Sequence, residues 1–383
     1  MTTRETLRRW WLAVTLAVAL PACATDGADP VETTPAARST QSADDDTLRV
    51  FLLAGQSNAG GYGFAYDRAG GQEERVTSIE YLLADDPDPR AYRASITADG
   101  SYPVLADLDE SWLEPRDDVW AVAYRSDAGI SQPVLATPSS PATDEARGVQ
   151  PLSPGFGLDD FHAASFGPEL AMGHRLGQQL EAPVLIVKST AGGTSLAEEW
   201  RSALAAEDRG GAVGASYTNT VAALRQTLDA LEADLADDGV LNRYGNATDF
   251  VVAGLVWVHG WNDHLEAAFV SEYEANLVDL IESIRQTHPR ISDALPVVVV
   301  ESADRDSAMN AARTGAVAEL NDRTAGSAVF VETGDLLDRG LGPEPADRTW
   351  SDTLDFHFHG KAENYLELGW RAAGALIDHD HLG

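Results

Sequence analysis

The sequence predicts an α/β fold in which a parallel β-sheet lies between two layers of helices. Short apolar segments rich in Val, Ile and Leu alternate along the chain with longer segments of helical periodicity. This alternation is typical of a parallel sheet covered on both faces, because neighbouring parallel strands need a long crossover connection. The chain has 383 residues, 44% of them hydrophobic, so it is long enough to bury such a core.

Five segments are expected to form the strands of this sheet. Each is a nearly continuous apolar run, as suits a strand that is buried on both faces. They are "LRVFLLAG" (48–55), "APVLIVKST" (182–190), "DFVVAGLVWVHG" (249–260), "LPVVVVES" (295–302) and "SAVFVET" (327–333).

Five further segments are expected to form helices that cover the sheet. Their apolar residues recur every three or four positions, which places them on one helical face. They are 166–180, 217–236, 272–287, 309–324 and 361–379.

One region interrupts the alternation of strands and helices. Residues 64–165 are rich in Asp, Pro and Gly, with short aromatic pieces such as "DDVWAVAYRS" (117–126). About a hundred residues without helical periodicity are too many for a simple loop. We therefore predict a β-rich insertion beside the first strand, which would build part of a pocket wall.

The N-terminus has the features of an export signal. Arginines precede an apolar run, Trp10–Leu20, which is too short to span a bilayer as a helix. The only cysteine, Cys23, directly follows "LPA", a pattern that resembles a bacterial lipobox, in which the cysteine is lipidated. We predict a lipoprotein signal peptide over residues 1–23; an ordinary signal peptide with an incidental cysteine is the alternative.

The residues that follow Cys23 predict a tether and then one folded domain. Residues 24–46 lack periodic apolar residues and are rich in Ala, Thr, Asp and Pro, which indicates a flexible linker. The folded domain is expected over residues 47–383. The predicted product is an exported bacterial lipoprotein of the cell envelope that touches the membrane only through its lipid anchor.

Charge narrows the classes of partner. The chain has 27 Lys and Arg against 61 Asp and Glu, a formal net charge of -34. Nucleic acids and anionic membrane faces attract basic surfaces, so both are excluded as partners. An acidic, solvated surface is expected, and an uncharged ligand is favoured over a polyanion.

A serine stands at the end of the first predicted strand, in "VFLLAGQSNAGGYG" (50–63). Ligands of parallel α/β sheets bind at the carboxyl ends of the strands. Small neighbours such as Gly55 and Gly60 allow a sharp turn that would leave the Ser57 hydroxyl accessible. Two interpretations follow from this segment alone: Ser57 is a nucleophile, or it is the N-cap of a helix.

Two other strand ends carry groups that could stabilise an oxyanion. "KSTAGGTSL" places Gly192 and Gly193 on a strand-to-helix turn, where backbone N–H groups could point at a ligand. "VHGWND" places Asn262 after the next apolar strand, and its amide could donate to the same oxyanion.

A carboxylate and an imidazole follow near the C-terminus. "SDTLDFHFHGKAENY" contains Asp352 and Asp355 beside His357 and His359, just before the last predicted helix. The chain order Ser, Asp, His is one of several that build a catalytic triad.

Together these blocks resemble the SGNH hydrolases, and within them the sialate O-acetylesterase and acetylxylan esterase group. The similar segments are "GQSN" (55–58), "FGPELAMG" (166–173), "KSTAGGTSLAEEW" (188–200), "VWVHGWND" (256–263) and "HFHGKAENYLELG" (357–369). The resemblance extends over most of residues 48–376 and is weak over 64–165. It implies a three-layer α/β/α sandwich with a flavodoxin-like sheet.

The resemblance also implies roles for individual residues. Ser57 would be the nucleophile, and its N–H would form the oxyanion hole with Gly193 (or Gly192) and Asn262. His357 would be the base, with His359 as the alternative. Family members usually carry Asp three residues before this histidine, where this chain has Leu354. Asp355 is therefore the candidate acid, and Asp352 is the alternative.

The implied activity is hydrolysis of O-acetyl groups from carbohydrates through a serine mechanism without a cofactor. A short-chain lipase or thioesterase of the same fold, or a glycan-binding surface lipoprotein without activity, are the alternatives. No Cys/His spacing typical of structural zinc and no P-loop occur in the sequence. The sequence carries no signal for the sugar, the linkage or an oligomeric state.

Overall fold

The computed structural model describes most of the predicted folded domain. The described residues are 46–66, 77–125, 134–136, 148–158, 164–337 and 355–378. The predicted signal peptide with Cys23, and the linker up to residue 45, lie outside them. None of the helices within these ranges has the length and apolar content that a membrane span requires.

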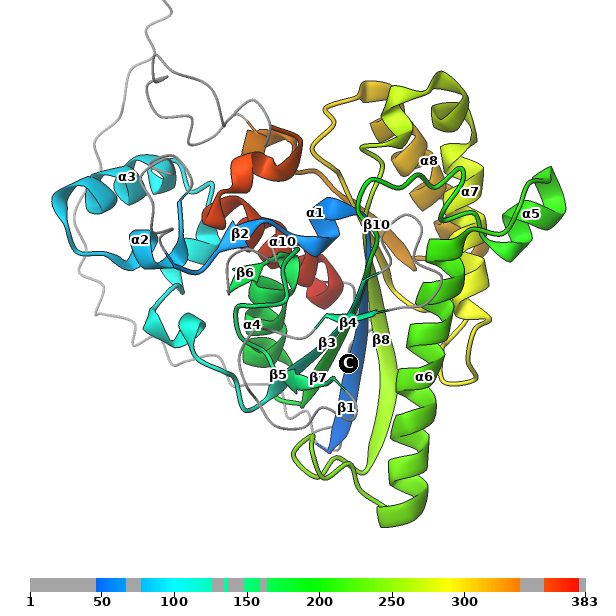
Figure 1. The fold of residues 1–383 in the computed structure, drawn as a ribbon, viewed down its shortest axis with the longest axis horizontal. Helices are drawn as coiled ribbons and strands as arrows, with labels where there is room; N and C mark the ends of the chain where they lie inside the picture. Colours follow the sequence, from blue (N-terminus) through cyan, green and yellow to red (C-terminus); the bar gives the residue numbers. More distant parts are fainter. Residues whose placement is uncertain are drawn as a thin grey trace, which may run out of the picture. The chain divides into compact units, whose positions relative to one another are not determined.

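A mixed, mostly parallel sheet forms the centre of the described domain (Figure 1). Seven of its eight described strands lie in the order β10-β9-β8-β1-β7-β3-β4, and the eighth, β5, pairs with β3. Only β4 and β5 run antiparallel to their neighbour. The strands are β1 (Thr47–Gly55), β3 (Val119–Arg125), β4 (Val134–Ala136), β5 (Gln150–Pro151), β7 (Val184–Thr190), β8 (Asp249–Val258), β9 (Val297–Val300) and β10 (Ala328–Val331). A separate pair joins β2 (Gly63–Phe64) to β6 (Ser165–Phe166).

Helices cover both faces of the sheet, as the sequence predicts. Alternate residues of β1 enter different cores, because successive side chains of a strand point to opposite faces. Val50 and Leu52 pack in one core with α6 (Ala215–Asp238), α7 (Ala267–Arg285) and α8 (Ser307–Arg323). Phe51 and Leu53 pack in the other with α4 (Pro168–Leu180) and α10 (Ala362–Asp378). Figure 1 shows these two helix layers on either side of the strands.

The strand order confirms the predicted fold class and locates a site. The strands β7-β1-β8-β9-β10 have the order of a flavodoxin-like sheet, and β3 extends it beyond β7. The chain leaves β1 toward β7 on one side and reaches β8 on the other, so β1 lies at the topological switch point. Ligands of such sheets bind at the carboxyl ends of the strands beside this point.

The segment for which the sequence predicts a β-rich insertion, residues 64–165, combines helices with strands in its described part. Its described part contains α2 (Ile79–Leu83), α3 (Pro87–Thr97) and two 3₁₀ turns, η1 (Pro103–Ala106) and η2 (Glu110–Leu113). Its longest strand, β3, belongs to the main sheet and pairs in parallel with β7. Helix α3 escaped detection because only Pro89 and Ile96 of its residues are buried, which leaves almost no apolar periodicity.

Candidate active site

Ser57 lies where the sheet topology predicts a site. Strand β1 ends at Gly55, and a single helical turn, α1 (Ser57–Gly60), follows at once. Gln56 is the N-cap of this turn, so Ser57 is its first helical residue and the N-cap interpretation of Ser57 is wrong. Ser57 is 8% exposed, among buried neighbours.

The turn before Ser57 requires a glycine. Gly55 has a φ of 145°, and a Cβ there would overlap the carbonyl oxygen of Val258. The close approach lets the Gln56 N–H donate to that oxygen at 3.2 Å, while Ala191 N–H donates to Gly55 O at 3.0 Å. The ends of β1, β7 and β8 therefore lie side by side.

Gln56, the residue before Ser57, forms hydrogen bonds with the segment that carries the predicted oxyanion donor, Asn262. The Nε2 of Gln56 donates to Oδ1 of Asn262 at 3.1 Å. The Oε1 of Gln56 accepts the backbone N–H of Gly260 at 2.9 Å. These two bonds place Asn262 next to the turn that carries Ser57.

Asn58, the residue after Ser57, forms hydrogen bonds with the segment that carries the predicted base, His357. Asn58 is fully buried, and its Nδ2 donates to the carbonyl oxygen of Phe356 at 2.9 Å. The hydroxyl of Tyr365 on α10 lies 3.0 Å from Oδ1 of Asn58 and 3.1 Å from the carbonyl oxygen of His357, and its single proton is shared between these two acceptors. These three contacts hold the backbone of Phe356 and His357 against the Ser57 turn.

The glycine turn after β7 is open toward its surroundings. Thr190, the last residue of β7, pairs with Gly55, so Gly192 and Gly193 follow beside the Ser57 turn. Gly193 has a φ of +68°, and a Cβ on either glycine would meet nothing within 4 Å. This leaves room for a ligand atom near the backbone N–H groups of the turn.

A buried carboxylate fastens the glycine turn to the Asn262 segment. Asp263 accepts the N–H of Leu196 at 2.9 Å and the N–H of Ala197 at 3.2 Å. Burial raises the pKa of Asp263 to about 7, against the opposing effect of these donors. The pKa of the neighbouring His259 is lowered by burial and by Arg313, so this imidazole is neutral and its 3.6 Å approach to Asp263 is not an ion pair.

His357 lies in an aromatic setting on η5 (Asp355–Gly360). Its ring stacks on Tyr62 with centroids 4.1 Å apart and contacts Phe356 at 4.3 Å. Burial lowers its pKa to about 4, so the imidazole is neutral and able to accept a proton at pH 7. Among the described residues, no group hydrogen-bonds its buried Nδ1.

The second histidine points to a different partner. The ring Nε2 of His359 lies 3.2 Å from the carbonyl oxygen of Leu337. Phe358 and His359 both have left-handed backbone, with φ of 49° and 59°. The side chain of Asp355 and the whole of Asp352 lie outside the described residues, so the choice of acid stays a prediction.

A buried ion pair that was not expected from the sequence supports the turn that carries Ser57. Lys188 on β7 is 1% exposed, and its Nζ donates to Gly60 O at 2.6 Å, Phe156 O at 2.7 Å and Glu169 Oε2 at 2.7 Å. Burial lowers the pKa of Lys188, and the charge of Glu169 opposes this shift. The sequence feature that could have indicated this ion pair is a lysine that follows four apolar residues of a strand. A charge buried there needs a partner of opposite charge.

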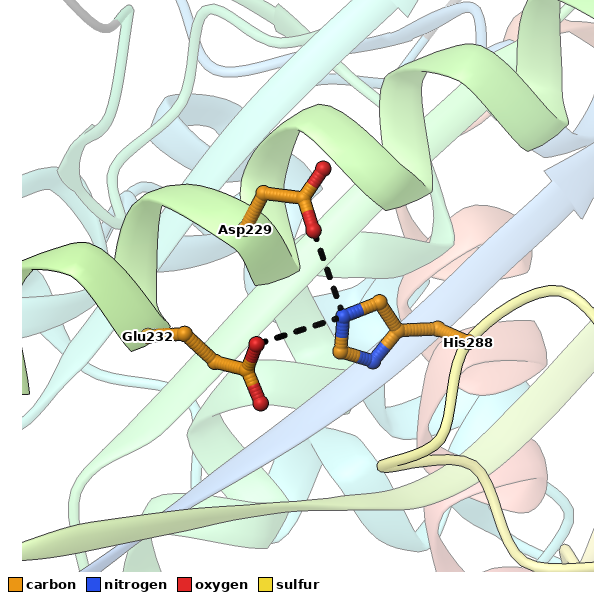
Figure 2. A group of neighbouring side chains, drawn as sticks. All are labelled: Asp229, Glu232 and His288. Atoms are coloured by element: carbon orange, nitrogen blue, oxygen red, sulfur yellow. Dashed lines mark ion pairs between the residues drawn. The ribbon is translucent and has the colours of Figure 1, made fainter.

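A group of possible metal ligands, Asp229, Glu232 and His288, lies outside the candidate active site (Figure 2). The Nε2 of His288 is 3.4 Å from Asp229 Oδ1 and 3.8 Å from Glu232 Oε2. The Nδ1 of His288 accepts the backbone N–H of Arg290 at 3.1 Å, so the ring proton is on Nε2 and faces the carboxylates. Arg290 also donates to Glu232 at 3.1 Å. We therefore interpret this group as a polar cluster in which Arg290 and the Nε2–H of His288 already supply hydrogen-bond donors to the carboxylates.

The sheet topology, with polar side chains at the carboxyl ends of its strands, is that of a ligand-binding α/β fold. A family model described as carbohydrate esterase, sialic acid-specific acetylesterase, matches residues 143–376, more than half of the chain. The chain therefore belongs to this family and is a carbohydrate O-acetylesterase. This confirms the resemblance found in the sequence.

Solved structures with a similar arrangement are distant in sequence. NanS is 13% identical, with 88% of this chain and 98% of that chain covered and a TM-score of 0.47. A protein from Arabidopsis thaliana is 16% identical, with 86% and 98% covered and a TM-score of 0.46. A carbohydrate acetylesterase from Xanthomonas citri is 16% identical, with 85% and 55% covered and a TM-score of 0.41. No curated protein matches the chain.

Proposed function

We propose that this acetylesterase removes O-acetyl groups with Ser57 as nucleophile and His357 as base. The observation that carries the proposal is the pair of residues flanking Ser57. Gln56 bonds the segment of Asn262, and Asn58 bonds the segment of His357. These bonds support the proposal, because they bring the segments of an amide donor and of a neutral imidazole, the groups that a serine hydrolase uses, to the turn that carries Ser57.

The proposed reaction has two steps. His357 takes the Ser57 proton while Oγ attacks the acetyl carbon, and the oxyanion is stabilised by the N–H groups of Ser57 and Gly193 and by the Asn262 amide. The protonated imidazole then gives its proton to the departing sugar oxygen. In the second step His357 takes a proton from water as it attacks the acetyl carbon, the bond to Oγ breaks, and His357 returns the proton to Oγ, so that acetate and free Ser57 are released.

The third member of the proposed triad is Asp355, with Asp352 as the alternative. Nδ1 of His357 has no hydrogen-bond partner among the described residues, so it is open to a carboxylate from this part of the chain. Such an acid would orient the imidazole and stabilise its protonated form.

Acetate release by the folded enzyme tests the nucleophile. O-acetylated sialic acid, acetylated xylan and p-nitrophenyl acetate would be compared with longer acyl esters, because a lipase or thioesterase would prefer longer chains. We expect Ser57→Ala to lower kcat on the order of 10⁴-fold or more. Ser271→Ala, an exposed serine on α7, is the matched control and should behave as wild type. Retained activity in Ser57→Ala would refute the assignment.

We also propose that the enzyme is exported and anchored through Cys23. The N-terminal apolar run and the "LPAC" sequence support this location. In a bacterial host the full-length chain should partition with membranes, and Cys23→Ser should release it. Recovery of the unmodified chain as free protein cleaved elsewhere would contradict the lipid anchor.

A further inference from the structure

The orientation of two side-chain amides follows from one backbone group. An amide side chain has a donor end and an acceptor end of similar shape, so its orientation depends on its hydrogen-bond partners. Gly260 N–H can only donate, and it points at the Gln56 amide at 2.9 Å. The end of Gln56 that faces Gly260 is therefore Oε1, and the end that faces Asn262 is the donor Nε2. The atom of Asn262 that meets this donor is in turn its acceptor, Oδ1.

We propose that Gln56 is a positioning residue, which occupies the oxygen of Asn262 and so turns its NH₂ group toward the oxyanion. The inference rests on the proposed function of Asn262. Without Gln56, the amide of Asn262 could present either its oxygen or its nitrogen to the substrate. Only the nitrogen stabilises negative charge, and an oxygen at the same place would repel it.

Burial favours this orientation of the Gln56 amide over the rotated one. Gln56 is 1% exposed and Gly260 is buried, so water does not replace a lost partner between these two groups, whereas Asn262 is half-buried. A rotated Gln56 amide would set its NH₂ group against the Gly260 N–H, leaving two buried donors opposed. The side chain of Asn262 also makes no capping bond to η3 (Asp263–Leu265), the 3₁₀ turn that it precedes. Its NH₂ group is therefore not used to cap that turn.

An isosteric substitution reverses the chemistry at one atom. In Gln56→Glu the ionised side chain can still accept the Gly260 N–H, but it can no longer donate to Asn262. It would instead accept from the Asn262 NH₂ group and draw this group away from the oxyanion. We expect kcat to fall roughly a hundredfold at pH 8 with KM little changed, as when one oxyanion donor is lost.

Acidification should then restore activity in this variant alone. A protonated carboxyl again has a donor, so kcat of Gln56→Glu should rise between pH 8 and pH 5. The base remains usable over this range, because burial lowers the pKa of His357 to about 4. Gln56→Ala loses activity without such a recovery, because it has no proton to regain.

Other ionisable groups near the amide pair are the same in all variants. His259 and Asp263 are on the segment of Asn262, Arg313 and Asp304 pack behind Gly260, and His357 comes from η5. The pKa of Asp263 is raised to about 7, so this carboxyl titrates within the tested range. Wild type and Gln56→Ala contain it too, so only the additional acid recovery of Gln56→Glu reports on position 56.

A remote amide provides the matched control. Asn321 also accepts a backbone N–H, from Ala328 at 2.8 Å, and donates to the Ala328 carbonyl at 2.9 Å. Asn321→Asp makes the same chemical change far from the site, and should alter stability without altering kcat or its pH profile. If Gln56→Glu does not fold, a double-mutant cycle replaces it: Gln56→Ala should lower kcat in wild type but hardly in the Asn262→Ala background.

The outcomes separate this inference from the proposed function. Full kcat of Gln56→Glu at pH 8 beside an impaired Asn262→Ala would overturn the role of Gln56 and leave that of Asn262 intact. An equal loss at every pH, or additive effects in the cycle, would overturn it in favour of a structural role. A normal kcat in Asn262→Ala, with Ser57→Ala inactive, would instead remove Asn262 from the proposed mechanism.

Discussion

The two sides of the candidate site are held in different ways. On the oxyanion side, Asn262 and Gly193 follow strands that pair directly with β1, the strand before Ser57. On the histidine side, His357 lies on η5 within a segment that also contains left-handed backbone at Phe358 and His359. The first side takes its geometry from the register of the sheet. The second depends on a few side-chain bonds from Asn58 and Tyr365, so it is the side that single substitutions can displace.

The largest expected effect separates the two histidines of that segment. His357→Ala should lower kcat on the order of 10⁴-fold or more, because the nucleophile loses its base. His359→Ala should retain a measurable fraction, since its Nε2 is directed to the carbonyl oxygen of Leu337. Kinetics of acetate release on both folded variants decide this. The reverse ranking would move the base by two residues and favour a different acid.

The next effect concerns the oxyanion side. Asn262→Ala should lower kcat about a hundredfold and leave KM nearly unchanged, because its donor acts mainly in the transition state. Thermal unfolding of the same preparation tells catalysis from stability. A lowered melting temperature with a normal kcat would show that Asn262 only joins the loops.

A smaller effect is expected from the bonds that hold His357. Tyr365→Phe removes the hydroxyl that bonds Asn58 and the His357 carbonyl, so the imidazole should lose its fixed distance from Ser57. Losing one such bond costs about 1 kcal/mol, so kcat should fall up to roughly tenfold with KM retained. Tyr124→Phe is the control, because that buried hydroxyl pairs with Thr227 at 3.1 Å within the sheet and helix layers. Equal losses of kcat in both variants would show a general stability effect.

The smallest effect is expected from moderate acid. With the pKa of His357 lowered to about 4, kcat/KM should stay nearly level from pH 8 to pH 5 and fall below that. An acid limb near pH 6.5 would contradict the low pKa and show that the proposed carboxylate on Nδ1, from Asp355 or Asp352, outweighs the effect of burial. The unfolded chain binds a proton at His357 more readily than the native one does. The contribution of this residue to stability is therefore full above about pH 6.5 and is lost as pH falls through about 4.

The same contrast explains what the sequence could predict. Apolar runs identify β1, β7 and β8, and parallel pairing then requires Ser57, Gly193 and Asn262 to share one edge of the sheet. The fold class follows from the same pattern. The helices of residues 64–165 were missed because their few buried residues leave little periodicity.

The partners of the site residues were harder to predict. Gln56 and Asn58 stand in the quoted motif, but nothing local shows that their amides reach 206 and 298 residues along the chain. Tyr365 lies within an apolar helix face and looks there like an ordinary core residue. Such long-range polar bonds depend on tertiary packing that neither propensity nor spacing encodes.

Lys188 links the chemistry to the order in which the chain assembles. Its ammonium group fills all three of its donor positions with Gly60, Phe156 and Glu169, which come from separate segments. The Ser57 turn therefore has its full support only in a chain in which β7, α4 and the segment of Phe156 are in place, and His357 lies just before the last helix. During biosynthesis or refolding, helical content should appear before hydrolysis. Newly made chains would therefore be inactive until folding is complete, and enzymatic activity would serve as a late, stringent marker of the native state.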